Sequence, residues 1–251
     1  MEDLNTLLCE IDRLKGRLDA LRPLDNPSIL HALDLEYTYE SNRIEGNTLT
    51  LRETELVIDR GLTVGGKSMR EHLEAINHHE ATLLLADLVR ERRPLTESLI
   101  RQLHGLILHA IDREHAGTYR RVPVMIAGSR HVPPQPWAVP VQMEQCLAWY
   151  GGEGQRLHPV VLAAELHERI ATIHPFIDGN GRTARLVMNL ILLSAGYPIA
   201  IVPGDTDSRR AYYDALEKAN LDGDKSDFHR FIAGQVRAMA QRLVAIAGGP
   251  Q

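Results

Sequence analysis

The sequence has little cysteine and no long hydrophobic run. Its two cysteines, Cys9 and Cys146, are too few for a disulfide framework or a four-cysteine zinc site. We expect both to be buried or half-buried reduced thiols. The longest apolar run, Leu186 to Ala195, is interrupted by Asn189 and falls short of the roughly 18–20 residues that span a membrane. The N-terminus is acidic, so we expect neither a signal peptide nor a membrane anchor.

The chain also lacks an excess of positive charge. Its 251 residues carry a net charge of -5, which argues against a protein that coats nucleic acid or an anionic membrane. Hydrophobic residues make up 44% and charged residues 24%, which is close to the average of globular proteins and excludes wholesale disorder. A chain of this length can bury a substantial core, and we expect a soluble, cytoplasmic protein.

The remaining composition favours helices over strands. Aromatic residues make up only 5% of the chain, whereas leucine, alanine, arginine and glutamate are abundant. Apolar spacing and capping residues predict helices over 3–22, 28–45, 51–60, 68–90, 96–110, 139–150, 159–172, 181–195, 208–221 and 227–245. The first helix carries a heptad seam of leucines that is shorter than three heptads. We expect that seam to pack against the protein's own core rather than in a coiled coil.

A period of two appears in one place, over residues 122–127. Val122, Val124 and Ile126 alternate there with other residues, and a Gly-Ser pair follows. The pattern predicts a short β-hairpin. The expected fold is therefore all-α with one small hairpin.

One segment, 174–185, concentrates the residues that carry chemistry. It reads His-Pro-Phe-Ile-Asp-Gly-Asn-Gly-Arg-Thr-Ala-Arg. Pro175 ends the preceding helix, so the imidazole of His174 lies at a helix exit. Asp178 supplies the hard oxygen ligand that Mg²⁺ prefers. The Gly-Asn-Gly turn can present backbone N–H groups to an anion at the start of the next helix, whose N-terminal end carries partial positive charge.

The two arginines of this segment indicate what the site binds. Arg182 and Arg185 lie in the first turn of the expected helix, where cations are locally unfavourable. A ligand with several negative charges would offset that cost, and a nucleotide polyphosphate with Mg²⁺ fits best, with His174 as general base. An EF-hand is excluded, because Arg182 and Asn189 would stand where Ca²⁺ ligands are needed. The sequence contains neither a P-loop nor a GxGxxG motif.

Residues 174–185 resemble, without a mismatch, the signature of Fic-family nucleotidyl transferases, His-Pro-Phe-x-(Asp/Glu)-Gly-Asn-Gly-Arg-x-x-Arg. Residues 41–46, Ser-Asn-Arg-Ile-Glu-Gly, resemble the inhibitory motif (Ser/Thr)-x-x-x-Glu-(Gly/Asn) of Fic proteins whose inhibitor precedes the catalytic core. The likeness extends from about residue 10 to 240. It implies a Fic-type helical bundle in which the hairpin is a flap over the active site.

The resemblance also implies how the chain is organised. We expect an N-terminal helical region over 1–95, which includes an inhibitory helix at about 28–46. The Fic catalytic core would follow over 96–240, and a C-terminal tail over 241–251.

The activity that the resemblance implies is protein adenylyl transfer, in which AMP passes from ATP to a hydroxyl side chain of a target protein. His174 matches the base that deprotonates that hydroxyl, and Asp178 matches the residue that holds the metal, Mg²⁺ or Mn²⁺. Phe176 matches an anchoring core position. The other matched positions bind the phosphates together with Asp178: Gly179, Asn180, Gly181, Arg182 and Arg185.

Glu45 matches the inhibitory glutamate, and Ser41 matches the first residue of the same motif. By resemblance, Glu45 pairs with Arg185, excludes the γ-phosphate and leaves ATP unable to bind productively. The physical logic is independent, because a carboxylate satisfies a waiting arginine until the ligand anion arrives. On the six-residue pattern alone, Glu45 could equally be a solvated helix-end residue.

Further matches surround the nucleotide and the target. The flap's exposed strand edge would hold a protein substrate by main-chain pairing. The flap end would touch the base, and two later residues would enclose adenine and ribose. These matched residues are Gly128, Ser129, Arg130 and His131, followed by Tyr212 and Asn220.

Other functions stay open on the sequence. The resemblance also implies a possible reverse reaction, in which Glu45 positions water and the same site removes AMP from a modified target. A non-catalytic nucleotide-binding regulator is a third reading, although the complete signature argues against it. We expect ATP and a protein substrate as partners, together with a homodimer, but neither nucleic acid nor a membrane. The 12 histidines form no zinc pattern. We expect solvated or capping roles for those outside the Fic matches: His72, His78, His79, His104, His109, His115, His158 and His167.

Overall fold

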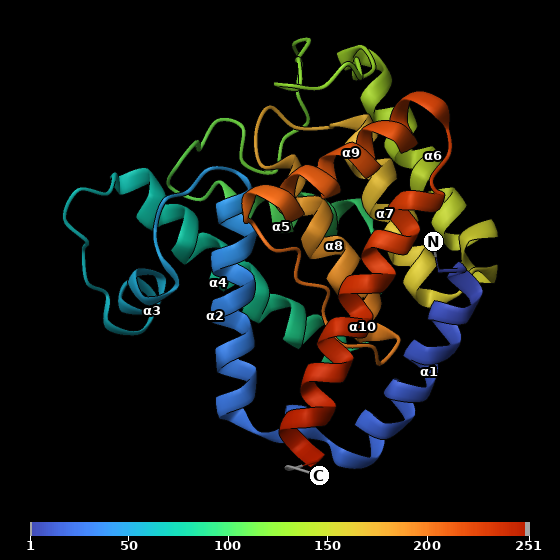
Figure 1. Cartoon of the computed structure of the whole chain (residues 1–251). Coiled ribbons are helices and arrows are strands. Elements are labelled where there is room, and N and C mark those ends of the chain that lie inside the picture. The colour runs from blue at the N-terminus through green and yellow to red at the C-terminus, as the bar shows by residue number, and fades with distance from the viewer. Residues whose placement is uncertain (1, 249–251) are drawn as a thin grey trace.

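The computed structural model describes residues 2–248, which form ten α-helices and three 3₁₀ helices (Figure 1). The α-helices are α1 (Leu4–Leu21), α2 (Pro27–Ile44), α3 (Leu51–Arg60), α4 (Met69–Arg90), α5 (Glu97–Ile107), α6 (Val139–Gly151), α7 (Pro159–Ile173), α8 (Asn180–Ser194), α9 (Thr206–Asp222) and α10 (Ser226–Gly248). The 3₁₀ helices are η1 (Pro23–Asp25), η2 (Pro136–Ala138) and η3 (Glu153–Arg156). The expected helices are all present, and their ends differ by only a few residues.

Local signals explain several of these ends. Helix α2 begins at Pro27, and the side chain of Asn26 accepts a hydrogen bond from the Ser28 N–H at 2.9 Å. At α3, Thr50 and Glu53 form the capping box that their spacing predicts: Glu53 N–H donates to Thr50 Oγ1 at 3.2 Å, and Thr50 N–H donates to the Glu53 carboxylate at 2.7 Å. Both caps satisfy N–H groups that the first turn of a helix leaves without partners.

The heptad seam of α1 packs along α10 within the same chain (Figure 1). The central part of the seam, from Leu7 to Leu18, is buried, whereas its last leucine, Leu21, and the opposite face of α1 are exposed. The expectation that the seam serves the protein's own core is therefore confirmed. The homodimer stays a prediction, and it no longer has this seam as a support.

Helix α8 lies at the centre of the bundle, between α7 and α4 (Figure 1). Nearly all of its side chains are buried, which is the pattern of a helix enclosed on every side. Even its buried amide, Asn189, is satisfied, since it accepts from the Ala200 N–H at 2.8 Å and donates to the Ala200 carbonyl at 3.2 Å. The helix that begins with the signature segment is thus rigidly held.

The β-hairpin expected over 122–127 is not formed, because the described residues contain no strand. Residues 118–135, here called the flap loop, are irregular apart from turns, such as the one in which Ser129 N–H donates to Ile126 O at 3.1 Å. Prolines explain the failure, since Pro123 cannot donate to a ladder. Buried Arg120 joins the two limbs instead, by donating to Val122 O at 3.2 Å and to Pro134 O at 2.5 Å.

The structure also corrects the expected burial of one cysteine and of several histidines. Cys9 is exposed rather than buried, although Cys146 is buried and both are free thiols. His158 caps α7 as expected, because its Nδ1 accepts from the Val160 N–H at 3.2 Å. Several other histidines are neither solvated nor caps, since they are buried in the core: His72, His78, His104 and His167.

Helix α10 continues through the first part of the expected tail and ends at Gly248, with Leu243 and Val244 buried. The rest of that tail, 249–251, lies outside the described residues. The division into N-terminal region, core and tail stays a prediction.

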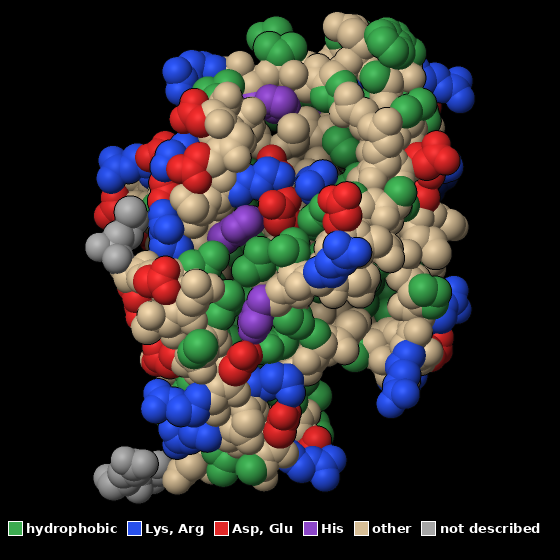
Figure 2. All heavy atoms as spheres, turned by 90° about the vertical axis from the view of Figure 1, so that its right-hand side faces the viewer, with side chains coloured by type: hydrophobic (Ala, Val, Ile, Leu, Met, Phe, Trp, Pro, Cys, Tyr) green, Lys and Arg blue, Asp and Glu red, His purple; other side chains and the backbone are tan. Residues whose placement is uncertain are grey.

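On the face drawn in Figure 2, acidic and basic side chains are interspersed around a hydrophobic area, so neither sign of charge dominates this face. Such a face lacks the continuous basic patch that binds a nucleic-acid backbone. Within residues 2–248, no helix is long and apolar enough to cross a membrane.

Candidate active site

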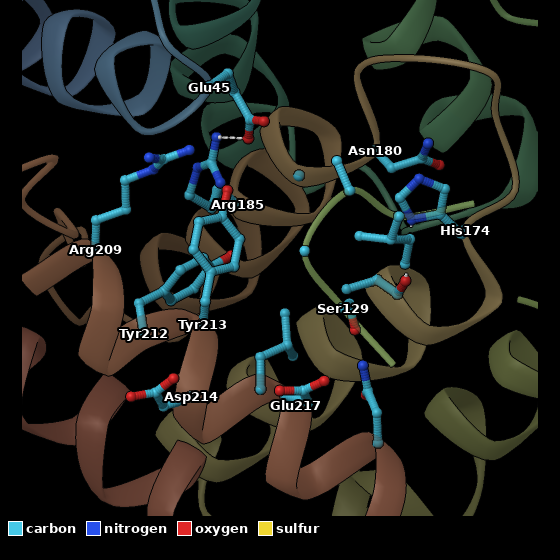
Figure 3. A pocket seen from close by; sticks show the side chains of 17 residues that line it. Glu45, Ser129, His174, Asn180, Arg185, Arg209, Tyr212, Tyr213, Asp214 and Glu217 are labelled. Carbon is cyan, nitrogen blue, oxygen red and sulfur yellow. Dashed lines mark hydrogen bonds and ion pairs between the residues drawn. The ribbon is translucent and has the colours of Figure 1, made fainter. Parts of the chain in front are cut away.

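A cavity of about 430 Å³ opens where the ends of α2 and α7 meet the start of α8 and one face of α9 (Figure 3). The flap loop closes one side of it. Residues from distant parts of the sequence therefore share one space. Its lining includes these expected site residues: Glu45, Gly128, Ser129, His174, Asn180, Gly181, Arg185, Tyr212 and Asn220.

His174 turns the chain out of α7. Its backbone adopts the left-handed conformation, with φ of 50°, and its N–H still donates to Ile170 O at 2.9 Å. Nδ1 lies 3.3 Å from the Ala171 carbonyl, which favours a proton on Nδ1 and a lone pair on Nε2. Burial lowers the pKa of the imidazole, and nearby Arg120 lowers it further. The ring is therefore neutral at pH 7 and can accept a proton.

The loop after His174 is fixed by its own backbone contacts. Asn180 Oδ1 accepts from Phe176 N–H, and its Nδ2 donates to Phe176 O, both at 2.9 Å. Gly179 has φ of +75°, and a Cβ there would stand 3.1 Å from the Ile107 side chain. Glycine is thus required at this position for conformation and for space. The chain then enters α8, whose first N–H groups have no hydrogen-bond partner within the helix.

His104 of α5 packs against this loop. Its ring stacks on Phe176 with centroids 3.6 Å apart, and its Nε2–H donates to Asp178 O at 2.9 Å. Nδ1 accepts from Gly117 N–H at 2.9 Å, which fixes the neutral tautomer. Burial lowers the pKa of His104 to about 4. This histidine is a structural support for the signature segment, and the sequence pattern gave it no role.

We expect His104→Ala to lower the free energy of unfolding by about 2–4 kcal/mol at pH 7.5, because two hydrogen bonds and a stacked ring are lost. In the unfolded chain His104 takes up a proton below its ordinary pKa of 6.5, but in the folded chain only below about 4. The wild-type protein therefore loses stability as the pH falls through that window, and the variant should lose less. Urea unfolding at several pH values measures both slopes. His109→Ala, at an exposed histidine nearby, is the control, and equal slopes for wild type and His104→Ala would contradict this account.

Arg185 and Glu45 form the polar centre of the cavity (Figure 3). The guanidinium is buried, and its Nη2 donates to Glu45 Oε1 at 2.7 Å and to Ser41 O at 2.9 Å. Its Nε donates to Ser41 Oγ at 3.0 Å. Burial alone would lower the pKa of Arg185, but the Glu45 carboxylate raises it above its ordinary value. The guanidinium is therefore charged at any working pH.

The Glu45 carboxylate also covers the start of α8. A Cβ added to Gly181 would collide with Glu45 Oε1, so the carboxylate lies directly against the backbone there. This is where a helix N-terminus favours an anion. Glu45 is the residue after α2, at its C-cap, and its side chain is 30% exposed. One negatively charged side chain thus occupies the anion position that the sequence predicts.

Asp178 and Arg182 do not line the cavity but form a network beside it. Asp178 Oδ1 accepts from Gly179 N–H at 2.6 Å and from Arg182 Nη2 at 3.2 Å, while its Oδ2 accepts from Arg70 Nη2 at 2.5 Å. Burial raises the pKa of Asp178, but these donors lower it more, and the net pKa lies below the ordinary value. Glu74 completes the network, 3.5 Å from Arg182.

The flap end contributes unevenly. Gly128 and Ser129 line the cavity, and Ser129 Oγ accepts from His131 N–H at 3.1 Å. His131 faces away from it, with Nε2 2.9 Å from Thr172 O. Arg130 is exposed, and its backbone N–H donates to Glu217 at 2.7 Å.

Four polar lining residues on α9 were missed by the sequence interpretation. Arg209, Tyr213 and Glu217 recur at helical spacing before Asn220, with Asp214 beside them. A polar face at a period of four was the available signal. Arg209 Nε donates to Ile44 O at 2.8 Å, so it holds the end of α2 next to Glu45. Tyr212 is anchored in turn, with its hydroxyl 2.9 Å from His167 Nε2.

Known proteins share both this site's segment and the whole fold. The Fic/DOC family profile matches residues 94–192. A crystal structure of a Fic-domain-containing signalling protein from Bacteroides thetaiotaomicron superposes with a TM-score of 0.87, at 30% identity, over 96% of this chain and 98% of that one. The chain belongs to the Fic/DOC family. Fic-1 from C. elegans (residues 134–508) gives a TM-score of 0.85 at 31% identity, over 97% of this chain and 72% of that one.

Curated Fic relatives carry an activity in their names. The protein adenylyltransferase Fic of Drosophila grimshawi is 40% identical over 199 residues, which are 79% of this chain and 40% of that protein. That of Culex quinquefasciatus is 37% identical over 235 residues, which are 88% of this chain and 45% of that protein. The chain therefore spans less than half the length of these relatives. The Fic resemblance to the solved structures extends well beyond the profile match, over α1–α4 and α9–α10 as well.

Proposed function

We propose that this chain is an autoinhibited protein adenylyltransferase. The observation that carries the proposal is the Glu45 carboxylate, which is hydrogen-bonded to Arg185 at 2.7 Å and lies against Gly181 in the cavity that His174 also lines. The names of its Fic relatives support the activity. In this proposal the cavity binds ATP and the Glu45 carboxylate occupies the place of the γ-phosphate.

The proposed reaction needs one base and one anion cradle. Nε2 of His174 takes the proton from a target hydroxyl, whose oxygen attacks the α-phosphorus of ATP. The bond from the α-phosphorus to the bridging oxygen breaks, pyrophosphate leaves and AMP stays on the target. The neutral imidazole supports the base role, and the start of α8 with Arg185 and Arg182 supports the cradle.

The proposed inhibition is electrostatic and steric. Ser41 and Glu45 engage Nε and Nη2 of Arg185, whereas Nη1 is buried without a hydrogen-bond partner among the described residues. The Glu45 carboxylate offsets the charge of the guanidinium and so weakens its attraction for the γ-phosphate. A second anion beside the Glu45 carboxylate would be repelled. ATP would therefore bind only weakly or in an unproductive pose while α2 stays in place.

Asp178 fits the divalent metal, Mg²⁺ or Mn²⁺, that the family uses. Mg²⁺ is typically held by one or two carboxylates together with phosphate oxygens, and residues 2–248 contain no group of three or more acidic, His or Cys side chains that could hold a metal ion by themselves. A single carboxylate of lowered pKa suits that arrangement. When bound, the metal would neutralise phosphate charge, and Arg70 would have to release Asp178 Oδ2.

We accordingly expect Arg70→Ala to tighten the apparent Mn²⁺ affinity in the presence of ATP by about two- to fivefold. The lost contact is an exposed ion pair, and such pairs contribute about 0.2–1 kcal/mol. Electron paramagnetic resonance of free Mn²⁺, in the Glu45→Gly background, measures the affinity without catalysis. Arg90→Ala removes another exposed arginine of α4 as the control. Weaker Mn²⁺ binding in Arg70→Ala would show that Arg70 assists the metal instead.

The protein substrate would dock along the flap loop. Met125 is 92% exposed and Val132 is 77% exposed, so apolar side chains are presented beside the cavity. Unpaired backbone groups of the irregular loop can pair with an extended target segment. This proposal keeps the docking role expected of the hairpin without its strands.

The position of the transferred label tests the reaction type. Glu45→Gly protein is incubated with a mixture of candidate target proteins and ATP labelled at either the α- or the γ-phosphate. AMP transfer retains α-label and no γ-label on protein. Retention of γ-label would instead identify phosphate transfer, and neither label would leave the reverse reaction to be examined with an AMP-modified protein.

One observation favours that reverse reaction as a second candidate. Only Oε1 of Glu45 has a hydrogen-bond partner among the described residues, and the side chain is 30% exposed. The other oxygen could orient a water toward an AMP ester. Release of free AMP from a modified target by the wild type, and not by Glu45→Gly, would support it.

A further inference from the structure

A second cavity, of about 250 Å³, lies between α2, α4 and α10, and it shares no lining residue with the active-site cavity. Its walls are leucines and other apolar side chains from these helices, from η1, and from the end of α8 and the segment after it. The lining consists of Leu24, Leu30, Leu33, Asp34, Tyr37, Thr82, Leu85, Ala86, Val89, Leu193, Pro198, Ile199 and Leu243. Asp34 is the only charged residue in this lining.

The charges around Asp34 are already engaged with other partners. His31, one turn earlier on α2, lies 3.0 Å from Asp59. Glu36 pairs with Arg242 of α10 at 2.6 Å. Asp34 itself has no hydrogen bond or ion pair with any residue between 2 and 248. The carboxylate is thus left beside an apolar wall with no cation bonded to it. His31 opposes the effect of burial on the Asp34 pKa, but its imidazole lies against Asp59.

This arrangement is costly for the protein alone. Burial raises the pKa of Asp34 to about 6, so the group is still mainly ionised at pH 7.5. An ionised carboxylate that is half-buried without a partner destabilises the fold. A ligand that supplied a positive charge would offset that cost, whereas a neutral or anionic ligand would not.

We propose that this cavity binds a small hydrophobic amine, with its apolar group between α2, α4 and α10 and its ammonium against Asp34. The volume exceeds the roughly 150 Å³ of a cavity that accommodates benzene. The ligand would rest on the helix that ends beside Glu45, about 16 Å before that residue along the helix. The site itself stands independently of the activity proposed above.

Calorimetry with two isosteric probes tests the site. Benzylamine carries the charge, and benzyl alcohol has the same shape without it. We expect benzylamine to bind the wild type about tenfold more tightly than benzyl alcohol, because the charge-assisted hydrogen bond is made only by the amine. Asp34→Asn should abolish this preference. Glu36→Gln, which removes a neighbouring paired carboxylate, should preserve it.

A cavity-filling variant separates the cavity from simple surface attraction. Ala86→Phe places a ring in the lining and should prevent both probes from binding. Thermal unfolding checks that each variant folds, and Asp34→Asn should melt about 2–4 °C above wild type at pH 7.5. Equal affinities of the two probes for wild type, an amine preference that survives Asp34→Asn, or no binding of benzylamine would each overturn the proposal.

Discussion

Glu45→Gly should raise the rate of AMP incorporation from α-labelled ATP by about 10- to 100-fold over wild type. The estimate follows from the charge-assisted hydrogen bond between Glu45 and Arg185, which contributes about 1.5–3 kcal/mol to keeping the anion position filled. Without the carboxylate, the buried guanidinium has no anion beside it, and the γ-phosphate can bind there. Initial rates at fixed ATP and Mg²⁺ measure the change.

The control for this variant is a glutamate in the same structural setting. Glu91 occupies the C-cap of α4, as Glu45 occupies that of α2, but it lies outside the cavity. Glu91→Gly should therefore leave incorporation at the wild-type level. Glu45→Gly should also lower the unfolding midpoint in the absence of ATP, because it leaves the Arg185 guanidinium with Ser41 as its only hydrogen-bond partner in residues 2–248. Equal incorporation by Glu45→Gly and wild type would contradict the inhibitory role.

His174→Ala should abolish most of the activity that Glu45→Gly releases, with a fall of about 10²- to 10⁴-fold in transfer rate. The loss belongs to the chemical step, because the imidazole accepts the proton and does not hold the phosphates. The affinity for ATP, measured by calorimetry, should change by less than about threefold. The predicted signature is therefore a large fall in kcat with binding retained.

The pH dependence adds an independent test of the same residue. Burial lowers the pKa of His174 below its ordinary value of 6.5. A base is active when deprotonated, so kcat/KM should rise with pH through a midpoint below 6.5 and be level near pH 7–8. His115→Ala, at a half-buried histidine outside the cavity, is the control. His174 would be ruled out as the base if Glu45→Gly/His174→Ala transferred AMP as fast as Glu45→Gly. A rise of kcat/KM with a midpoint above pH 7 would rule it out as well.

The sequence anticipated the parts of the site that lie within one continuous segment. The stretch from His174 to Arg185 fixes its own geometry, because Asn180 binds the backbone of Phe176 and Gly179 must turn the chain. Helix ends were equally local, as the capping box of Thr50 and Glu53 shows. Such features depend on neighbouring residues, so spacing alone predicts them.

The features that the sequence did not anticipate depend on contacts between distant segments. The alternation over 122–127 predicted two hydrogen-bonded strands. Pro123 has no backbone N–H to donate, and Arg120 connects the two sides of the flap loop through the carbonyls of Val122 and Pro134 instead. Cys9 follows an apolar pattern and yet faces solvent, because α10 covers the other side of α1. The unpaired Asp34 is visible only once three helices are placed around it.

The proposed inhibition makes one claim that separates it from every other role for Glu45: the carboxylate competes with the γ-phosphate and with no other part of the nucleotide. Calorimetric titration of wild type and Glu45→Gly with ATP and with ADP, both in Mg²⁺, tests this claim directly. We predict that Glu45→Gly binds ATP at least about tenfold more tightly than wild type does, with ADP affinity unchanged. Equal gains for both nucleotides, or no gain for ATP, would contradict the account.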